Sequence, residues 1–433
     1  MEKIKIAIIN GEVFINKRFR KVQILIEDKK IKRVIYRKLN EDDLKGYFLI
    51  DAQDSYVSAG FIDPHVHFRC PGQEHKEDWN TGTRAAIKGG FTFVMDMPNN
   101  IPSATNYNIL YQKNNLAKLT NINYGFYLGL SDTNSGNIKK IFNFCKKKVP
   151  LYGIKVFLGS STGDLLVKNE QSIKYSLNTG EINLFHCEDE NTLARYKHIQ
   201  YNSVSDHNAI RPPESEIEGI KRIIRQAKAI KSKAKIYICH ISSAKQLKYL
   251  KKLRKLGYNI INEVTPHHLF FSLSNIEQSN IFKVNPPIRE ESDVKYLRRN
   301  FNKGFFDVIG TDHAPHKFEE KNSPTPPSGF PGLETAFYAL YNLYEQKILS
   351  LNKIFELFTS GYKIFGIKKR GEIKKGNFAD ITIIKKIPNT FKAEKSETKA
   401  DFSCYDNLKT NCKIDTVIIN GKIVLKDSEF LPN

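Results

Sequence analysis

GFIDPHVHFR, residues 60–69, is an apolar run that ends in two histidines, His65 and His67, two positions apart. On a β-strand, side chains two positions apart point to the same side, so both imidazoles would face one point. Imidazoles that converge in this way are typical of a metal site. We therefore interpret the segment as half of a metal centre. Three further candidate ligands end later apolar runs: His186, His240 and Asp312.

Apolar, β-rich runs recur along the middle of the chain at an almost constant spacing. The first five begin near Phe61, Phe91, Ile122, Tyr152 and Ile182, which gives start-to-start distances of 30, 31, 30 and 30 residues. Three more begin near Lys235, Asn259 and Phe306. Helical patterns lie between them at residues 79–88, 106–118, 138–147, 171–177, 214–232, 244–256 and 293–301.

Eight strands that alternate with helices predict a closed (β/α)8 barrel of the α/β class. In barrels of this kind the loops that follow the strands converge at one end and carry the chemistry. The candidate ligands all stand at the carboxyl ends of their predicted strands. Their positions in the sequence therefore agree with a single metal centre at that end of the barrel.

The two ends of the chain resemble each other and differ from the middle. The sequence Ile-Ile-Asn-Gly occurs at residues 8–11 and again at residues 418–421, and an Asn-Gly pair between apolar runs is a hairpin signal. We expect residues 1–56 and 368–433 to form one small flanking β domain, and residues 57–367 to form the barrel. The polar stretch 386–400 is expected to be a loop or poorly ordered.

Composition limits the kind of protein that the chain can be. No apolar stretch approaches the ~20 residues that a membrane helix needs, and the first residues lead into a strand, so we expect a cytoplasmic protein with no membrane partner. Six scattered cysteines without a C-x-x-C pair suit a reducing compartment. The formal charge of +22 is spread over surface helices such as residues 248–255, which favours a solvated basic surface over a nucleic-acid partner.

Three residues near the candidate ligands are harder to interpret. Lys155 lies inside the fourth apolar run, where an ammonium is poorly tolerated unless it is paired, so it is either a salt-bridged or snorkelling lysine or part of the metal site. Cys187 and Cys239 each adjoin a candidate histidine. Strand alternation predicts that both cysteines face away from the metal and pack in the core.

Five motifs follow one another along the chain: DPHVHFR at 63–69, MPN at 97–99, EVTPHH at 263–268, KVNPP at 283–287 and GTDHAPH at 310–316. Together with Lys155 on the fourth strand, they resemble the amidohydrolase superfamily and most closely its dihydroorotase family. The resemblance covers nearly the whole chain. It implies a metal-dependent hydrolase of cyclic amides that acts on a small-molecule substrate.

The resemblance also implies a ligand set for two metal ions, zinc being the expected element. His65 and His67 would bind one ion, and His186 and His240 the other. Lys155, carboxylated by carbon dioxide into a carbamate, would bridge them. Asp312 would bind the first ion and act as the general base.

Substrate contacts are implied in the same way. The planar guanidinium of Arg69 can hold the ring carboxylate of dihydroorotate through two parallel hydrogen bonds. The implied reaction is the reversible hydrolysis of L-dihydroorotate to N-carbamoyl-L-aspartate, which pyrimidine biosynthesis runs toward ring closure. Further contacts to the ring are expected from Asn99, Asn285 and His316 and from the backbone of Ser328 and Gly329.

Two departures from the family pattern and several alternatives stay open. Cys70 follows Arg69 where the family usually has an acidic residue, and the Asp-Asp-Gly segment that replaces the bridging lysine in some relatives is absent.

Hydantoinases, dihydropyrimidinases and allantoinases would share the metals but generally lack Arg69, and a non-catalytic dihydroorotase-like scaffold would not need the intact ligand set. His267 and His268 are expected to support the site, and His313 to point away from it. A homodimer or a complex with aspartate carbamoyltransferase is also open.

Overall fold

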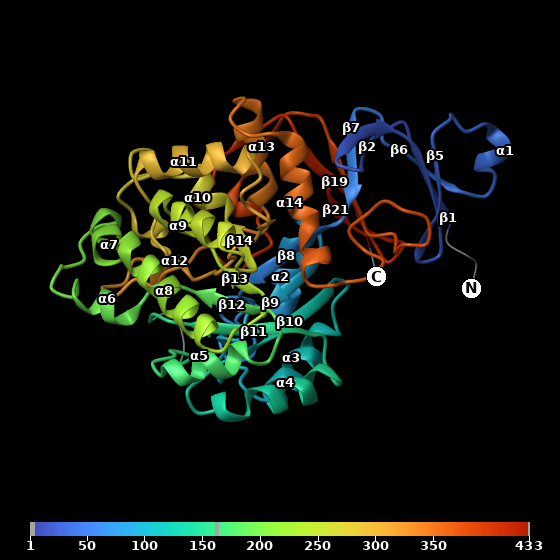
Figure 1. Cartoon of the computed structure of the whole chain (residues 1–433). Coiled ribbons are helices and arrows are strands. Elements are labelled where there is room, and N and C mark those ends of the chain that lie inside the picture. The colour runs from blue at the N-terminus through green and yellow to red at the C-terminus, as the bar shows by residue number, and fades with distance from the viewer. Residues whose placement is uncertain (1–4, 161–163, 432–433) are drawn as a thin grey trace.

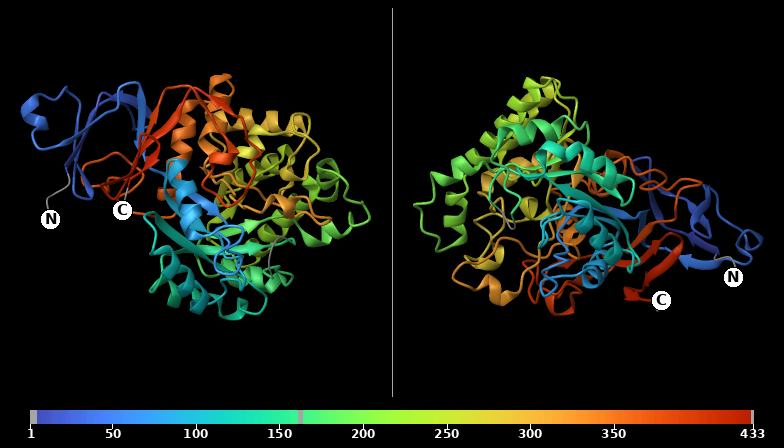
Figure 2. Two further views of the ribbon diagram at one scale, coloured as in Figure 1. Left: turned by 180° about the vertical axis from the view of Figure 1, so that it is seen from behind. Right: turned by 90° about the horizontal axis from the view of Figure 1, so that it is seen from below.

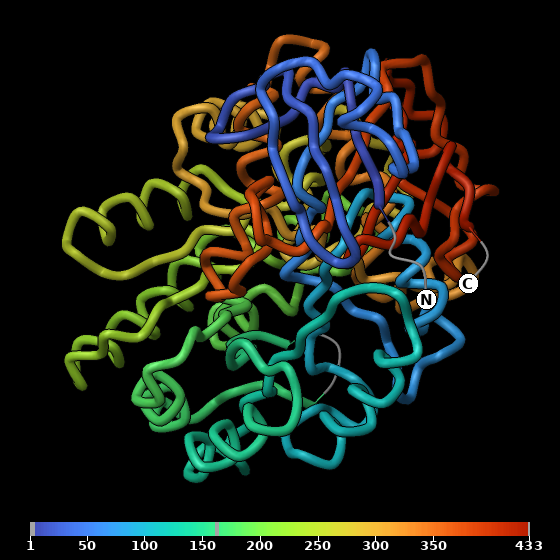
Figure 3. The backbone as a smooth tube through the Cα atoms, turned by 90° about the vertical axis from the view of Figure 1, so that its right-hand side faces the viewer, coloured from blue at the N-terminus to red at the C-terminus, as the bar shows by residue number. Residues whose placement is uncertain are grey.

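The structure is a computed structural model that describes residues 5–160 and 164–431 (Figure 1). Its centre is a barrel of eight strands surrounded by helices, and the two ends of the chain form β-sheets beside the barrel (Figure 2). The blue N-terminal strands and the red C-terminal strands lie on the same side of the molecule (Figure 3). The predicted α/β class, the (β/α)8 barrel and the flanking β-structure from both termini are thereby confirmed.

All eight predicted barrel strands are present, and each pairs in parallel with the next along the chain. They are β8 Phe61–Val66, β9 Phe91–Asp96, β10 Asn123–Gly129, β11 Leu151–Phe157, β12 Asn183–His186, β13 Ile236–Ile238, β14 Ile260–Val264 and β15 Val308–Ile309. The first and last strands meet where the His67 amide donates to the His313 carbonyl at 2.8 Å. The Asp63 carboxylate also accepts from the Thr311 amide at 3.1 Å. The sheet therefore closes into a barrel.

The predicted helices lie within three residues of their expected ends, and several begin at a side chain that caps them. Asp78 accepts from the amides of Asn80 and Thr81, and Ser243 accepts from that of Gln246, which satisfies donors that a helix start leaves free. None of the helices in the described ranges combines the length and apolar character needed to cross a membrane. The α-helices are α1 Glu41–Leu44, α2 Trp79–Lys88, α3 Tyr107–Ala117, α4 Ile138–Lys146, α5 Glu170–Leu177, α6 Glu190–Ala194, α7 Val204–Ile210, α8 Pro213–Ala229, α9 Ala244–Lys255, α10 Pro266–Phe270, α11 Glu291–Asn302, α12 Phe318–Lys321, α13 Ala336–Glu345 and α14 Leu351–Ile364.

Strand alternation divides the barrel core into two layers. Side chains such as Ile62, Leu184 and Tyr237 fill the interior. Their neighbours along the strands, such as Phe61 and Phe185, pack between the strands and the helices. The interior of the barrel is thus a packed core, as is usual for barrels that carry their chemistry at one end.

Two flanking sheets are built from the termini. A four-stranded sheet has the order β5-β4-β1-β6, and a seven-stranded sheet has the order β21-β20-β19-β16-β7-β2-β3. N- and C-terminal segments join where β7 pairs antiparallel with β16. The flanking strands are β1 Lys5–Ile9, β2 Glu12–Ile15, β3 Arg18–Lys21, β4 Gln23–Glu27, β5 Lys30–Ile35, β6 Phe48–Asp51, β7 Ser55–Ala59, β16 Ile381–Lys385, β19 Lys413–Ile419, β20 Lys422–Lys426 and β21 Glu429–Phe430.

The two Asn-Gly pairs behave differently, so one hairpin prediction is confirmed and the other is wrong. Asn420 and Gly421 connect β19 to β20, which pair antiparallel as a hairpin. Asn10 and Gly11 instead carry the chain from β1 in one sheet to β2 in the other. Long-range partners hold that crossing, because the Asn10 side chain donates to Asp51 at 2.9 Å.

The polar stretch 386–400 is mostly a loop, as predicted, with two short elements. These are β17 Asn389–Thr390, which pairs with β18 Lys409–Thr410, and a 3-10 helix at Ala393–Lys395. The Glu397 amide then donates to Glu334 of the barrel at 2.7 Å, so the loop is tied to the barrel wall. The domain boundaries expected near residues 56 and 368 stay a prediction; β7 spans the first of them.

Candidate active site

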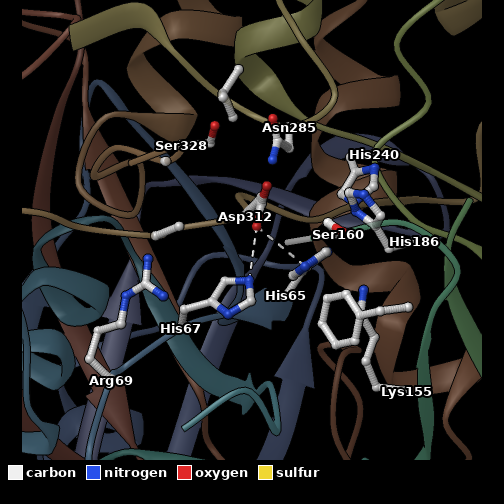
Figure 4. A pocket seen from close by; sticks show the side chains of 14 residues that line it. His65, His67, Arg69, Lys155, Ser160, His186, His240, Asn285, Asp312 and Ser328 are labelled. Carbon is white, nitrogen blue, oxygen red and sulfur yellow. Dashed lines mark hydrogen bonds and ion pairs between the residues drawn. The ribbon is translucent and has the colours of Figure 1, made fainter. Parts of the chain in front are cut away.

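A cavity of about 230 Å³ opens at the carboxyl end of the barrel strands (Figure 4). Ten of the twelve predicted site residues line it, and Asn99 and His316 are not among the lining residues. The ten are His65, His67, Arg69, Lys155, His186, His240, Asn285, Asp312, Ser328 and Gly329.

His65, His67 and Asp312 form one group of potential ligands. Asp312 Oδ1 lies 3.3 Å from His65 Nε2 and 3.1 Å from His67 Nε2 (Figure 4). Burial raises the pKa of Asp312, but the two imidazoles outweigh this and hold it well below its usual range. Burial alone would lower the pKa of His65, yet the carboxylates of Glu263 and Asp312 raise it to about 10. Positive charge is therefore favoured between these carboxylates, and a divalent metal ion would meet the same preference.

His186 and His240 form the second group. His186 Nδ1 lies 3.0 Å from His240 Nε2, and the ring centroids are 4.8 Å apart. Burial lowers the pKa of both imidazoles, which keeps them neutral, as metal ligands must be. Glu188 Oε2 lies 2.8 Å from His186 Nε2 and would fix the ring with its Nδ1 lone pair toward His240.

Lys155 is fully buried on β11 and lines the same cavity. In the described part of the chain, no carboxylate lies within 4.0 Å of its Nζ, which donates instead to Cys239 Sγ at 3.1 Å. A salt-bridged or snorkelling lysine does not fit these surroundings. A buried ammonium without a counterion is costly, so the lysine points to a chemical role.

Cys239 corrects one prediction about alternation. Its side chain packs with the residues that fill the barrel interior and contacts Lys155, so it does not face away from the site. The reason is the backbone of His240, whose φ of 36° ends the regular strand and lets two successive side chains point inward. Cys187 packs in the outer layer, as expected.

Backbone strain accompanies the site. Arg69, His240 and Asp312 have φ values of 60°, 36° and 51°, in a region that residues other than glycine seldom adopt. Each such residue costs on the order of 1 kcal/mol or more. All three lie two or three residues beyond the end of a barrel strand, and their side chains line the cavity.

Glu263 was not assigned a role from the sequence, although it lies within a quoted motif. Its carboxylate accepts from the Tyr237 hydroxyl at 2.7 Å and the His240 amide at 2.7 Å, and Oε1 lies 2.9 Å from His65 Nδ1. It therefore orients a residue from each ligand group, as outer partners of metal ligands do. The feature of the sequence that could have indicated this role is the presence of a glutamate inside an apolar strand.

Asn99 contacts His67, one of the proposed metal ligands, from outside the cavity. Its Oδ1 lies 2.6 Å from His67 Nδ1, so it orients that imidazole from outside the cavity. A substrate contact by Asn99 stays a prediction.

Arg69 and His316 lie together at the edge of the cavity. Arg69 Nε donates to the Pro315 carbonyl at 3.3 Å, and Nη2 lies 3.1 Å from His316 Nε2. Lys76 Nζ lies 3.1 Å from the other ring nitrogen, Nδ1, and ion-pairs with Glu320 at 2.9 Å. Burial and the neighbouring cations lower the pKa of His316, so its ring is neutral and Lys76 donates to Nδ1. A substrate carboxylate at this edge would thus meet the cation of Arg69.

The remaining predicted residues lie around the cavity or behind it. Asn285 and Ser328 lie on the side of Asp312 opposite His65 and His67 (Figure 4). Away from the cavity, the His313 imidazole accepts from the Gly332 amide at 3.1 Å, as expected for a structural residue.

The two consecutive histidines of α10 are buried. His268 contacts Thr265 Oγ1 at 2.7 Å and the Pro286 carbonyl at 3.1 Å, which is a supporting arrangement. His267 packs against the Phe330 ring, with centroids 5.1 Å apart.

Imidazoles and a carboxylate that converge at the carboxyl end of a (β/α)8 barrel are typical of hydrolases that use divalent metal. Comparison with known proteins agrees. The family model described as "Amidohydrolase family" matches residues 56–159 and 192–424. The dihydroorotase of Pyrococcus furiosus is 34% identical over 430 residues, covering 98% of this chain and 94% of that protein. The dihydroorotase of Carboxydothermus hydrogenoformans is 35% identical over 385 residues, covering 87% of each chain.

Solved structures show the same fold at lower identity. The L-hydantoinase (dihydropyrimidinase) of Arthrobacter aurescens aligns with a TM-score of 0.90 at 20% identity, covering 99% of this chain and 97% of that one. The dihydropyrimidinase of Brevibacillus agri aligns with a TM-score of 0.87 at 22% identity, covering 99% and 96%. The chain belongs to the amidohydrolase family and, by its curated relatives, to the dihydroorotases within it.

Proposed function

We propose that this chain is a dihydroorotase that interconverts L-dihydroorotate and N-carbamoyl-L-aspartate in pyrimidine biosynthesis. One observation carries the choice of substrate. Arg69 lines the cavity, and within the described ranges no carboxylate lies within 4.0 Å of its guanidinium. A ring carboxylate is the group that this guanidinium would pair with through two parallel hydrogen bonds. The dihydroorotase relatives over nearly the full chain support the same substrate.

We infer that the site takes two zinc ions and that Lys155 is carboxylated between them. The donor set fits, because two groups of imidazoles face inward and His240 Nδ1 is a buried nitrogen without a partner in the described part of the chain. Carboxylation would turn the unpaired Lys155 ammonium into an anion that offers oxygen ligands to both groups. When bound, zinc ions would supply an activated water near neutral pH and polarise the amide carbonyl of the ring.

The chain's own residues would then bind the substrate and move the proton. Asp312 takes a proton from the attacking water and passes it to the ring nitrogen that leaves, a transfer that its position beside His65 and His67 allows. Arg69 orients the ring through its carboxylate. Asn285, His316, Asn99 and the Ser328–Gly329 backbone are the proposed contacts to the rest of the ring.

The second candidate is a cyclic amidohydrolase of the hydantoinase, dihydropyrimidinase or allantoinase type. The fold neighbours with hydantoinase and dihydropyrimidinase names favour it as the alternative, but at 20–23% identity they support the fold alone. A non-catalytic scaffold is disfavoured because all six proposed ligand positions line one cavity. A cytoplasmic location, a homodimer and a complex with aspartate carbamoyltransferase stay predictions.

The test is a comparison of turnover on zinc-loaded protein with dihydroorotate, hydantoin, dihydrouracil and allantoin. We expect dihydroorotate to be opened at least about tenfold faster than the other rings, since only its carboxylate pairs with Arg69. Turnover of another ring with inert dihydroorotate would reject the substrate while leaving the hydrolase class intact.

A further inference from the structure

Lys321, the last residue of α12, is fully buried and plays no part in the chemistry proposed above. Its Nζ donates to three backbone carbonyls, those of Lys283 at 2.9 Å, Pro327 at 3.0 Å and Gly329 at 3.0 Å. Among the residues that the structure describes, no carboxylate lies within 4.0 Å of this ammonium. The three acceptors match the three N–H donors of a protonated lysine.

Burying this ammonium is costly. Burial, together with a smaller effect of the neighbouring Lys283 cation, lowers the pKa of Lys321 to about 7. An uncharged side chain at this position would avoid the desolvation of a charge. The benefit of the lysine must therefore lie in what its three hydrogen bonds hold together.

The three carbonyls belong to two segments that line the cavity. Lys283 is two residues before Asn285, and Pro327 and Gly329 flank Ser328. The Gly329 amide also donates to the Lys283 carbonyl at 2.9 Å, so the two segments meet directly above the ammonium. Both segments belong to the set of predicted substrate contacts.

The 327–329 segment has a backbone that would not hold its shape through local preference alone. Gly329 has a φ of 126°, and a β-carbon there would lie 2.5 Å from the Ala314 carbonyl oxygen. Only glycine fits, and glycine is also the most flexible residue. The hydrogen bonds from the buried Lys321 ammonium supply the order that the segment itself lacks.

We propose that Lys321 is a positioning residue, whose ammonium fixes the Ser328–Gly329 backbone and the Asn285 segment against each other so that both face the substrate ring. This inference rests on the proposed function and deepens it, because it names what aligns the wall that recognises the ring. Lys321 does not touch the reacting atoms. It acts through the two segments that it ties.

The test replaces Lys321 by Met and measures kcat, KM for dihydroorotate and bound zinc. We expect KM to rise about tenfold or more while kcat changes less than about threefold and zinc content stays the same, because the ligands do not contact this lysine. Lys321→Arg keeps the charge but has a planar fork that suits three converging carbonyls less well, so its KM should rise by a smaller factor. If Lys321→Met does not fold, kcat, KM and bound zinc are compared with the wild type in Lys321→Gln and Lys321→Arg instead.

A matched control lies at the opposite end of the barrel. Arg254 pairs with Asp307 and donates to the carbonyls of Ile260 at 2.9 Å and Phe305 at 3.3 Å. Arg254→Met should lower the melting temperature and leave KM unchanged. Hydrogen exchange at the amides of residues 328–330 should be faster in Lys321→Met than in the wild type and unaffected by Arg254→Met.

The outcomes separate this inference from the proposed function. If the wild type opens dihydroorotate and KM is unchanged in every Lys321 variant, or if Arg254→Met raises KM as much, the positioning role is rejected and the function stands. If dihydroorotate is inert, the proposed function fails, and the same KM comparison is made with the ring that the wild type opens.

Discussion

The active-site end of the barrel and the flanking seven-stranded sheet both bury charged side chains, but they treat them differently. Next to β16, Asp380 pairs with Arg370 and accepts from the Asn420 amide at 2.7 Å. At the barrel end, Arg69 and Lys155 line the cavity, and no carboxylate lies within 4.0 Å of either in the described part of the chain. Arg69 and Lys155 therefore lack the carboxylate partner that Arg370 has.

This difference indicates that the buried charge pair of the flanking sheet stabilises the fold, whereas the unpaired charges of the barrel end are available to a ligand. A paired buried charge can hold segments in place, and the Asp380–Arg370 pair lies where the C-terminal strands join the molecule. An unpaired buried charge costs stability unless hydrogen bonds or a ligand compensate it. Under the proposed function, these unpaired charges reduce stability and serve the binding of an anion and metal ions, so substitutions in the two regions should have different consequences.

The largest effect is expected from Lys155→Ala. It would remove the proposed bridge between the two ligand groups, so turnover should fall by at least about 10³-fold and one zinc should be lost. Activity and zinc content by mass spectrometry are the measurements. Lys386→Ala is the control, because that lysine pairs with Glu12 at 2.5 Å in the flanking region and should change neither value. Retention of both ions and of turnover by Lys155→Ala would show that the lysine is no bridge.

Asp312→Asn and Asp380→Asn allow a direct comparison of the active-site end of the barrel with the flanking sheet. The first should lower kcat by about 10²–10⁴-fold with metal retained, because an amide cannot accept the proton. The second should leave kcat unchanged and cost about 3 kcal/mol of unfolding free energy, because it leaves Arg370 without its partner. Kinetics and denaturant unfolding on both variants provide the measurement. A normal kcat in Asp312→Asn would exclude it as the base.

A smaller and more selective effect is expected from Arg69→Met. Loss of the guanidinium should raise KM for dihydroorotate by about 10²-fold, since a charge-assisted bidentate pair is lost. Any slow turnover of hydantoin or dihydrouracil should not fall, because their rings carry no carboxylate. An equal loss with all substrates would mean that Arg69 supports the structure of the site and does not select the ring.

The barrel and its ligands could be predicted because each depends on a local pattern. Apolar runs, the first five of them about thirty residues apart, predicted the eight strands, and polar residues at their ends predicted His65, His186, His240 and Asp312. A strand's end is visible in the sequence, and strand ends in a parallel barrel necessarily meet.

The sequence-based predictions were wrong or incomplete where contacts between segments distant in the sequence determine the structure. Identical Ile-Ile-Asn-Gly stretches form a hairpin at 418–421 and a crossing between sheets at 8–11, because β1 finds its partners in β4 and β6. Glu263 contacts His65 across 198 residues of sequence, and no local pattern indicates that pair. Likewise, Cys239 and His240 both point inward because of the unusual φ of His240, which strand alternation does not indicate.

The smallest effect is expected at the contact between the barrel and the polar loop at residues 386–400. Glu334 of the barrel is buried and accepts from Ser396 and the Glu397 amide, and burial raises its pKa to about 7 from the usual value of 4.5. A carboxyl group with a raised pKa in the folded state stabilises it fully below pH ~4.5, and that contribution is lost as the pH rises through ~7. The wild type should thus lose about 1–3 kcal/mol relative to Glu334→Gln between these pH values. Urea unfolding of both proteins from pH 4.5 to 8 measures this difference, and a difference independent of pH would mean that Glu334 is already ionised throughout the range.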